Sequence, residues 1–139
     1  MSTSKVIYLN DLRTNAIHLA SGNTIVTDAP VDNHGKGEAF SPTDLAATSL
    51  AACMITVLGI HADKNGINMN TTHAEVTKIM SIEGPRRIVG IDVQLEIVTT
   101  EEMDEKQRII LERVAKTCPV SLSLHPDIQQ NIAISFKTA

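Results

Sequence analysis

The chain has two cysteines, and their thiols are the side chains best suited to nucleophilic chemistry. Cys53 lies inside a long apolar stretch, whereas Cys118 stands directly before Pro119. A thiolate is the reactive form of cysteine, and it attacks peroxides and disulfides when its surroundings favour the charge. The first question is therefore whether either position offers such surroundings, or whether both thiols only fill a core.

Cys53 falls in the middle of a predicted helix. Ser41 is a good N-cap, Pro42 suits the first helical position and Asp44 the third, and Gly66 supplies a stop after Lys64. The Ser-x-x-Asp spacing resembles a capping box.

This helix is apolar almost all round and rich in small residues, which predicts deep burial. A thiol in such a place packs like a small hydrophobic group. If it reacts, an Arg or Lys brought by the fold must stabilise the thiolate.

Cys118 has a different local setting. The run Cys118-Pro119-Val120-Ser121 places proline at the first position of a short helix, with the cysteine as its N-cap. The backbone amides there favour a thiolate, so Cys118 is locally the better activated thiol. The alternative is that it ends the apolar stripe of the preceding helix as a core residue.

Metal binding is not favoured by the spacing of the possible ligands. His61 follows Cys53 by eight positions and His125 follows Cys118 by seven, which matches neither a Cys-x-x-Cys nor a His-x-x-x-His pattern. The other histidines belong to no motif. We therefore expect no metal and no bound cofactor.

The elements around the cysteines predict an α+β class. Short strands over 6–9, 17–19 and 24–27 come first, with a turn over 10–15 and a polar, glycine-rich loop over 29–40 that could form a lid. The cysteine helix follows, then strands over 73–81 and 89–97. A second helix starts at 100–102, a short helical turn covers 120–124, and a strand over 131–137 ends the order. The expected order is β-β-β-α-β-β-α-β, with antiparallel sheets, in a single domain over residues 1–139.

Composition excludes several classes of function. The 139 residues carry a net charge of −4 and only 2% aromatic residues, which leaves neither a basic surface nor a stacking platform for nucleic acid. Polar residues interrupt the apolar stretch 45–61, so we expect a core helix rather than a membrane span. The N-terminus lacks the apolar stretch of a secretory signal, and two cysteines make no disulfide framework, so a cytoplasmic location is expected.

Several motifs together are similar to those of one family. They are Ser41-Pro42-Thr43-Asp44-Leu45, Ala51-Ala52-Cys53, Pro85-Arg86-Arg87-Ile88 and Thr117-Cys118-Pro119-Val120-Ser121. With two cysteines 65 positions apart in this element order, the chain resembles the OsmC/Ohr superfamily of osmotically induced and organic hydroperoxide resistance proteins. The resemblance spans roughly residues 41 to 124.

The resemblance implies an intertwined homodimer whose sheets wrap around the buried cysteine helices. It also implies a cysteine peroxidase that reduces organic hydroperoxides without metal or haem. Cys53 would then be the peroxidatic residue and Cys118 the resolving one, with a dithiol of the lipoyl type as external reductant. This assignment opposes the local ranking of the two thiols given above.

One departure from the family pattern concerns the acidic partner of an N-terminal arginine. The peroxidases carry a Glu ten residues before the first cysteine, where this chain has Thr43. Asp44 lies about 180° around the helix from Cys53, so it suits the helix start instead. Arg13 is the sole candidate for the family arginine, and Glu38 could replace the missing carboxylate.

Three functions remain open at this point. The retained cysteines favour a peroxidase, whereas Thr43 favours a small-molecule binding or sulfur-handling protein with little peroxidase activity. A structural dimer with two core thiols is the third.

Overall fold

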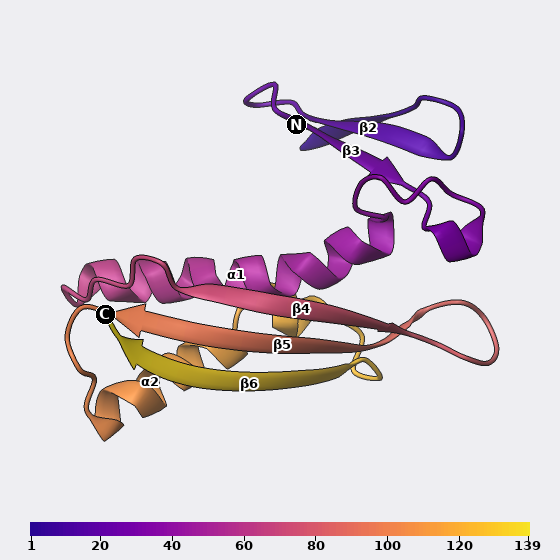
Figure 1. The fold of residues 1–139 in the computed structure, drawn as a ribbon. Helices are drawn as coiled ribbons and strands as arrows, with labels where there is room; N and C mark the ends of the chain where they lie inside the picture. The colour runs from indigo at the N-terminus through magenta and orange to yellow at the C-terminus, as the bar shows by residue number, and fades with distance from the viewer. The chain divides into compact units, whose positions relative to one another are not determined.

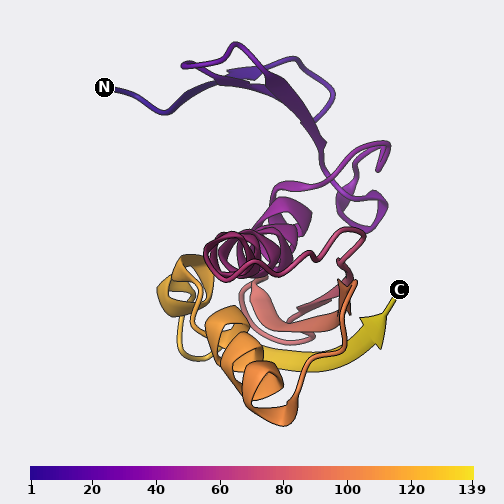
Figure 2. The same ribbon diagram turned by 90° about the vertical axis from the view of Figure 1, so that its left-hand side faces the viewer.

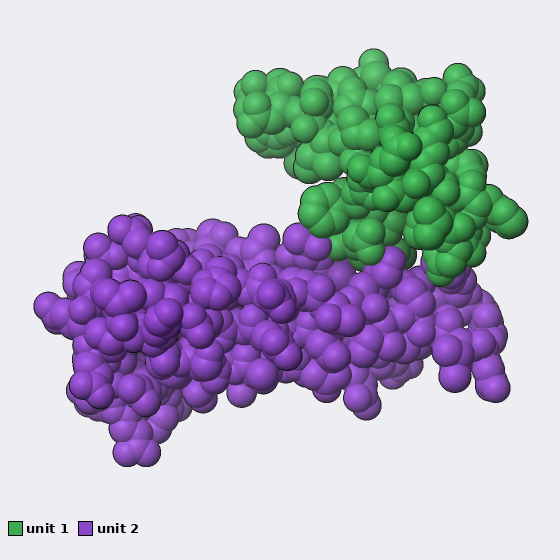
Figure 3. Space-filling model, viewed as in Figure 1, with its two compact units in different colours: residues 1–46 green, residues 47–139 purple.

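The structure is a computed structural model that describes residues 1–139. The chain divides into two compact units, residues 1–46 and residues 47–139, shown in green and purple in Figure 3.

The first unit contains an antiparallel sheet in the order β1-β2-β3, with β1 over Ser4–Tyr8, β2 over Arg13–His18 and β3 over Thr24–Asp28. The sequence predicts the second strand only from Ile17, after a turn over 10–15, but β2 begins at Arg13. Three successive left-handed residues, Asn10, Asp11 and Leu12, complete that turn, with φ angles of 70°, 54° and 62°. Arg13 is therefore already a strand residue.

The loop after β3 holds one short 3-10 helix, η1, over Val31–Asn33. Backbone hydrogen bonds close the loop on itself and on its neighbours: Gly37 N–H donates to Ala29, and Asp28 N–H donates to Phe40. The loop is thus ordered, although its sequence predicts no regular element.

Helix α1 covers Pro42–Lys64, and its start confirms the predicted capping box. The Ser41 side chain accepts from the Asp44 N–H, and the Asp44 carboxylate accepts from the Ser41 N–H, both at 3.0 Å. This reciprocal pair satisfies two backbone donors that the helix itself leaves unbonded. Asp44 therefore stabilises the start of the helix, as the sequence indicated.

The second unit contains a mixed sheet in the order β4-β5-β6 (Figure 1), with β4 over His73–Met80, β5 over Ile88–Thr99 and β6 over Gln129–Thr138. Strands β4 and β5 are antiparallel, but β6 runs parallel to β5, which differs from the wholly antiparallel sheets that we expected. Helices α2, over Glu105–Lys116, and α3, over Pro119–Ser123, form the crossover that a parallel pair needs.

Helix α2 begins later than predicted. Its N-cap is Asp104, whose carboxylate accepts from the Gln107 N–H at 2.8 Å, while the Gln107 side chain accepts from the Asp104 N–H at 3.0 Å. Asp104 and Gln107 form a complete capping box, so the segment from Thr100 stays outside the helix.

The hydrophobic core of this unit lies on one face of the second sheet, and the helices gather on that face (Figure 2). The alternation predicted for 89–97 is confirmed: four residues of β5, Ile91, Val93, Leu95 and Ile97, are at most 2% exposed. They pack with α1, including Leu50, Met54 and Leu58, and with Leu111 of α2.

Helix α1 is long enough and apolar enough to cross a membrane, by length and composition alone. A long core helix of a soluble protein passes the same test, so this property by itself says little about its surroundings.

Candidate functional site

Cys53 lies on helix α1, more than two helical turns away from either end of the helix. The residue is half-buried and lies against the hydrophobic core of the second unit. Its neighbours one turn away range from the buried Leu50 to the exposed Thr56. The thiol is therefore held on a rigid element, with part of the side chain still open to solvent.

Cys118 lies at the break between α2 and α3 and is only 1% exposed. Its sulfur accepts a hydrogen bond from the Ser121 N–H at 3.4 Å, so it is the N-cap of α3 that the Cys-Pro motif predicted. The Cys118 thiol also lies close enough to Cys53 for the two side chains to interact. The fold thus brings together two thiols that are 65 positions apart in sequence.

Burial raises the pKa of the Cys118 thiol, and the adjacent Cys53 raises it further. The Ser121 N–H acts in the opposite direction but does not outweigh burial. The expectation that Cys118 is the better activated thiol is therefore correct about the backbone amide but wrong about the direction of the pKa shift. The amide of the short helix is in place, but desolvation of the charged form is the larger effect.

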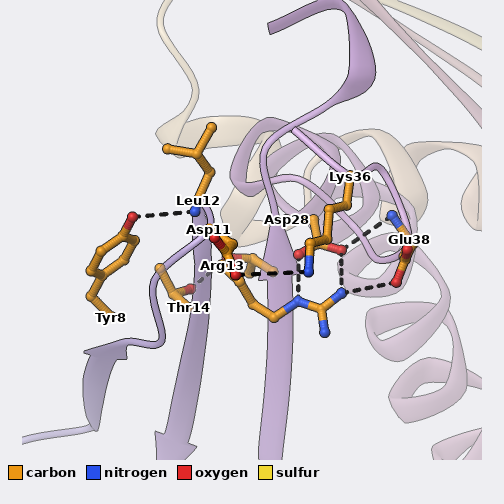
Figure 4. A network of polar contacts seen from close by, with 9 residues as sticks. Tyr8, Asp11, Leu12, Arg13, Thr14, Asp28, Lys36 and Glu38 are labelled. Atoms are coloured by element: carbon orange, nitrogen blue, oxygen red, sulfur yellow. Dashed lines mark hydrogen bonds and ion pairs between the residues drawn. The ribbon is translucent and has the colours of Figure 1, made fainter. Parts of the chain in front are cut away.

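Arg13 belongs to a cluster in the first unit that involves two carboxylates (Figure 4). Its Nε donates to Asp28 Oδ1 at 2.7 Å and its Nη2 donates to Asp28 Oδ2 at 2.9 Å. The same Nη2 donates to Glu38 Oε2 at 3.2 Å. The structure thus brings Arg13 and Glu38 together; their role in chemistry stays a prediction.

Asp28 is the main partner of Arg13, and the sequence analysis missed it. It is 0% exposed, and it also accepts from the Glu38 N–H at 3.1 Å. Hydrogen bonding by Arg13 holds the pKa of the Asp28 carboxyl below its usual range, against the effect of burial. The same contact raises the pKa of Arg13. The sequence offered one signal for the Arg13–Asp28 pair. Asp28 ends the third strand of an antiparallel meander, and in such a sheet it lies opposite Arg13 at the start of the second strand.

Thr43 occupies the position of the family glutamate and lies in the first turn of α1. Its hydroxyl interacts with the Ser41 hydroxyl at 3.1 Å. Thr43 has no charge to offer an arginine, so in this chain Asp28 and Glu38 are the carboxylates that hold Arg13.

A family profile described as OsmC-like protein matches residues 35–133. The chain belongs to this OsmC-like family. The match includes both cysteines and every element from α1 to α3, so it covers most of the chain. No protein with a curated description matches this OsmC-like chain.

Solved structures confirm the OsmC-like fold. A protein from Psychrobacter arcticus 273-4, named for an osmotic stress and detoxification response, is 54% identical, with 96% of each chain covered and a TM-score of 0.89. An OsmC-like protein from Mycoplasma pneumoniae is 20% identical over 96% of this chain and 95% of that one, with a TM-score of 0.77. An organic hydroperoxide resistance protein OsmC from Legionella pneumophila is 15% identical over 97% and 96%, with a TM-score of 0.71. The last two similarities establish the fold alone.

Proposed function

We propose that this OsmC-like chain is a thiol peroxidase that reduces organic hydroperoxides through Cys53 and Cys118. The observation that carries the proposal is the contact between a half-buried thiol on α1 and a buried thiol at the start of α3. A peroxide can reach the first more easily, while the second is already positioned to react with the oxidised product.

The reaction has two steps on the protein. The Cys53 thiolate attacks the hydroperoxide and breaks its O–O bond, which gives a sulfenic acid and, after protonation of the leaving oxygen, an alcohol. The Cys118 thiol then displaces water from the sulfenic acid and forms a disulfide. An external dithiol reduces this disulfide by thiol–disulfide exchange and leaves as its own disulfide.

The raised pKa of Cys118 supports this order of events. A group that stays protonated at neutral pH is a poor first nucleophile towards peroxide. Its closeness to Cys53 supports a role in the second step, in which it would meet the sulfenic acid. Cys53 is therefore assigned the attacking role and Cys118 the resolving role.

Arg13 is proposed to stabilise the thiolate, with Glu38 as one of the carboxylates that orient it. The support is that the guanidinium is fixed by Asp28 and Glu38 through Nε and Nη2. A guanidinium fixed in this way keeps its Nη1 donors for a further anionic group. A lipoyl-type dithiol as reductant, a homodimer, a cytoplasmic location and a chemistry without metal or bound cofactor belong to the same proposal.

A second candidate is a small-molecule binding or sulfur-handling protein with little peroxidase activity. It is favoured by Thr43, whose hydroxyl is engaged within the helix cap where the peroxidases have a glutamate. The two candidates differ in the rate at which Cys53 reacts with a peroxide.

The test is to treat the reduced protein with one equivalent of cumene hydroperoxide and to identify the products by mass spectrometry. The wild type is expected to lose two thiols per chain and form an intramolecular disulfide. Cys118→Ser is expected to react as fast and to accumulate sulfenic or sulfinic acid at Cys53. Cys53→Ser is expected to show only slow oxidation of Cys118.

Two outcomes would contradict the proposal. Fast formation of sulfenic acid at Cys118 in Cys53→Ser would reverse the two roles. Equal inertness of the wild type and both variants would favour the binding protein.

A further inference from the structure

A polar side chain stands at the start of the apolar inner face of β6. The residues Ile132, Ile134 and Phe136 alternate along the strand and contact the core, and Gln130 precedes them on the same face. Gln130 is opposite the buried Ile91 of β5 in the sheet register. A glutamine at such a position needs partners for its amide.

Both ends of the Gln130 amide bind the same residue of α3. The Ser121 hydroxyl donates to Gln130 Oε1 at 2.6 Å, and Gln130 Nε2 donates to the Ser121 carbonyl oxygen at 3.0 Å. These two bonds form a clamp, here called the Gln130–Ser121 clamp, which connects α3 to the sheet.

Helix α3 depends on such contacts because it has only five residues. A helix of this length is not stable by its own backbone hydrogen bonds. The carbonyl that Gln130 binds is one that the short helix leaves without an internal partner. The clamp therefore fixes where α3 lies on the sheet.

The same residue of α3 also binds the Cys118 sulfur. The Ser121 N–H donates to Cys118 Sγ at 3.4 Å, and the Cys118 thiol in turn contacts Cys53. A continuous series of contacts thus runs from Gln130 through Ser121 to the two thiols.

We propose that Gln130 is a positioning residue that, through Ser121, holds the Cys118 sulfur where it closes the disulfide with Cys53. The inference rests on the proposed function for its role in turnover. It concerns the second step only, since the clamp touches neither Cys53 nor a bound peroxide. Closure joins the two sulfurs and releases one water from the Cys53 sulfenic acid and the Cys118 thiol.

The main variant is Gln130→Met, which keeps the length of the side chain and removes both hydrogen bonds. Disulfide closure is expected to slow about tenfold, a factor in keeping with the loss of two ordinary hydrogen bonds. Formation of sulfenic acid at Cys53, measured in a Cys118→Ser background, is expected to stay within about twofold of its reference. Because the sulfenic acid persists longer, excess peroxide should convert more Cys53 to sulfinic acid.

Two further variants separate positioning from general damage. Ser121→Ala removes one bond of the clamp and should slow closure less than Gln130→Met. Asn131→Leu is the matched control, because Asn131 is the next residue of β6 and bonds to Asp92 instead of to α3. It should leave closure unchanged. Circular dichroism at the assay temperature checks that each variant is folded.

The measurement follows closure in each protein by rapid quenching, alkylation and mass spectrometry, with cumene hydroperoxide in one arm and diamide in the other. Diamide takes two electrons and two protons from the thiols, so it closes the disulfide without a peroxidase step. Slow closure of Gln130→Met with both oxidants supports the inference.

Failure of the two proposals can be told apart. If cumene hydroperoxide leaves the wild type unreacted, the peroxidase proposal fails, and the diamide arm alone then decides the role of Gln130. If Gln130→Met closes as fast as the wild type with diamide, or if Asn131→Leu slows it equally, the inference is wrong.

Discussion

The burial of Cys118 has a consequence that can be measured at a single sulfur. Burial is the largest cause of its raised pKa and persists when Cys53 is replaced. In Cys53→Ser, alkylation of Cys118 by iodoacetamide should therefore have its midpoint above pH 9.0, the ordinary value for the thiol. A midpoint at or below pH 8 would show that the Ser121 N–H outweighs burial.

Asp28 predicts an acid-sensitive contribution to stability. Its pKa is lower in the folded protein than the ordinary 3.8, so its ionised form stabilises the fold above that pH. The stabilisation is lost as pH falls through the lower, folded pKa. Between pH 7 and pH 3 the wild type should therefore lose more stability than Asp28→Asn, as measured by urea denaturation of both proteins at each pH.

Glu38 provides the control for Asp28, because it meets the same guanidinium but is 67% exposed. Solvent screens such a pair, so Glu38→Gln should change the acid sensitivity much less than Asp28→Asn. Equal effects of the two substitutions would show that the buried contact has no special role. The comparison also tests whether Asp28, and not Glu38, is the main anchor of Arg13.

The first turn of α1 shows how a whole element is fixed by its start. Ser41 and Asp44 satisfy each other's backbone N–H, and the helix then runs for 23 residues to Lys64. Ser41→Ala should lower the free energy of unfolding by about 1 kcal/mol, as loss of an N-cap does. Chemical denaturation gives this value directly.

Asp44→Asn is the conservative companion of that variant, since Asn keeps an acceptor oxygen for the Ser41 N–H. It should cost less than Ser41→Ala and leave the rate of Cys53 alkylation nearly unchanged. A large fall in thiol reactivity with an unchanged unfolding midpoint would mean that Asp44 acts on the thiol after all.

At the scale of the whole molecule, the first unit exposes an unusual amount of apolar side chain. On one face of its sheet, Val6, Tyr8 and Ile25 are 63%, 59% and 50% exposed, and Ile7 and Val26 are exposed on the other. A three-stranded sheet of this kind needs a covering layer. This favours the intertwined homodimer that the family resemblance implies.

Sedimentation equilibrium at micromolar concentration should therefore give twice the chain mass of 15.0 kDa. Val6 and Tyr8 lie on β1 of the first unit, so replacing them leaves the core of the second unit unchanged. Val6→Asp and Tyr8→Asp should shift the equilibrium towards monomer or unfold the sheet. A stable, folded wild-type monomer at that concentration would contradict the prediction.

The sequence by itself determined the features that depend on neighbours along the chain. Ser41 and Asp44 are three positions apart, which suffices for a capping box, and Cys118 before Pro119 suffices for an N-cap. The alternation over 89–97 determined which face of β5 is buried. The family motifs placed both cysteines in the right elements, and the OsmC-like family is confirmed.

Only the tertiary structure decided the features that depend on residues distant in sequence. The contact between Cys53 and Cys118, the Asp28 partner of Arg13 and the parallel pairing of β6 arise from packing and register, which no local pattern specifies. The same reason corrects the ranking of the thiols. A Cys-Pro pattern reveals the amide that favours a thiolate, but desolvation depends on everything packed around the sulfur, and at Cys118 desolvation is the larger effect.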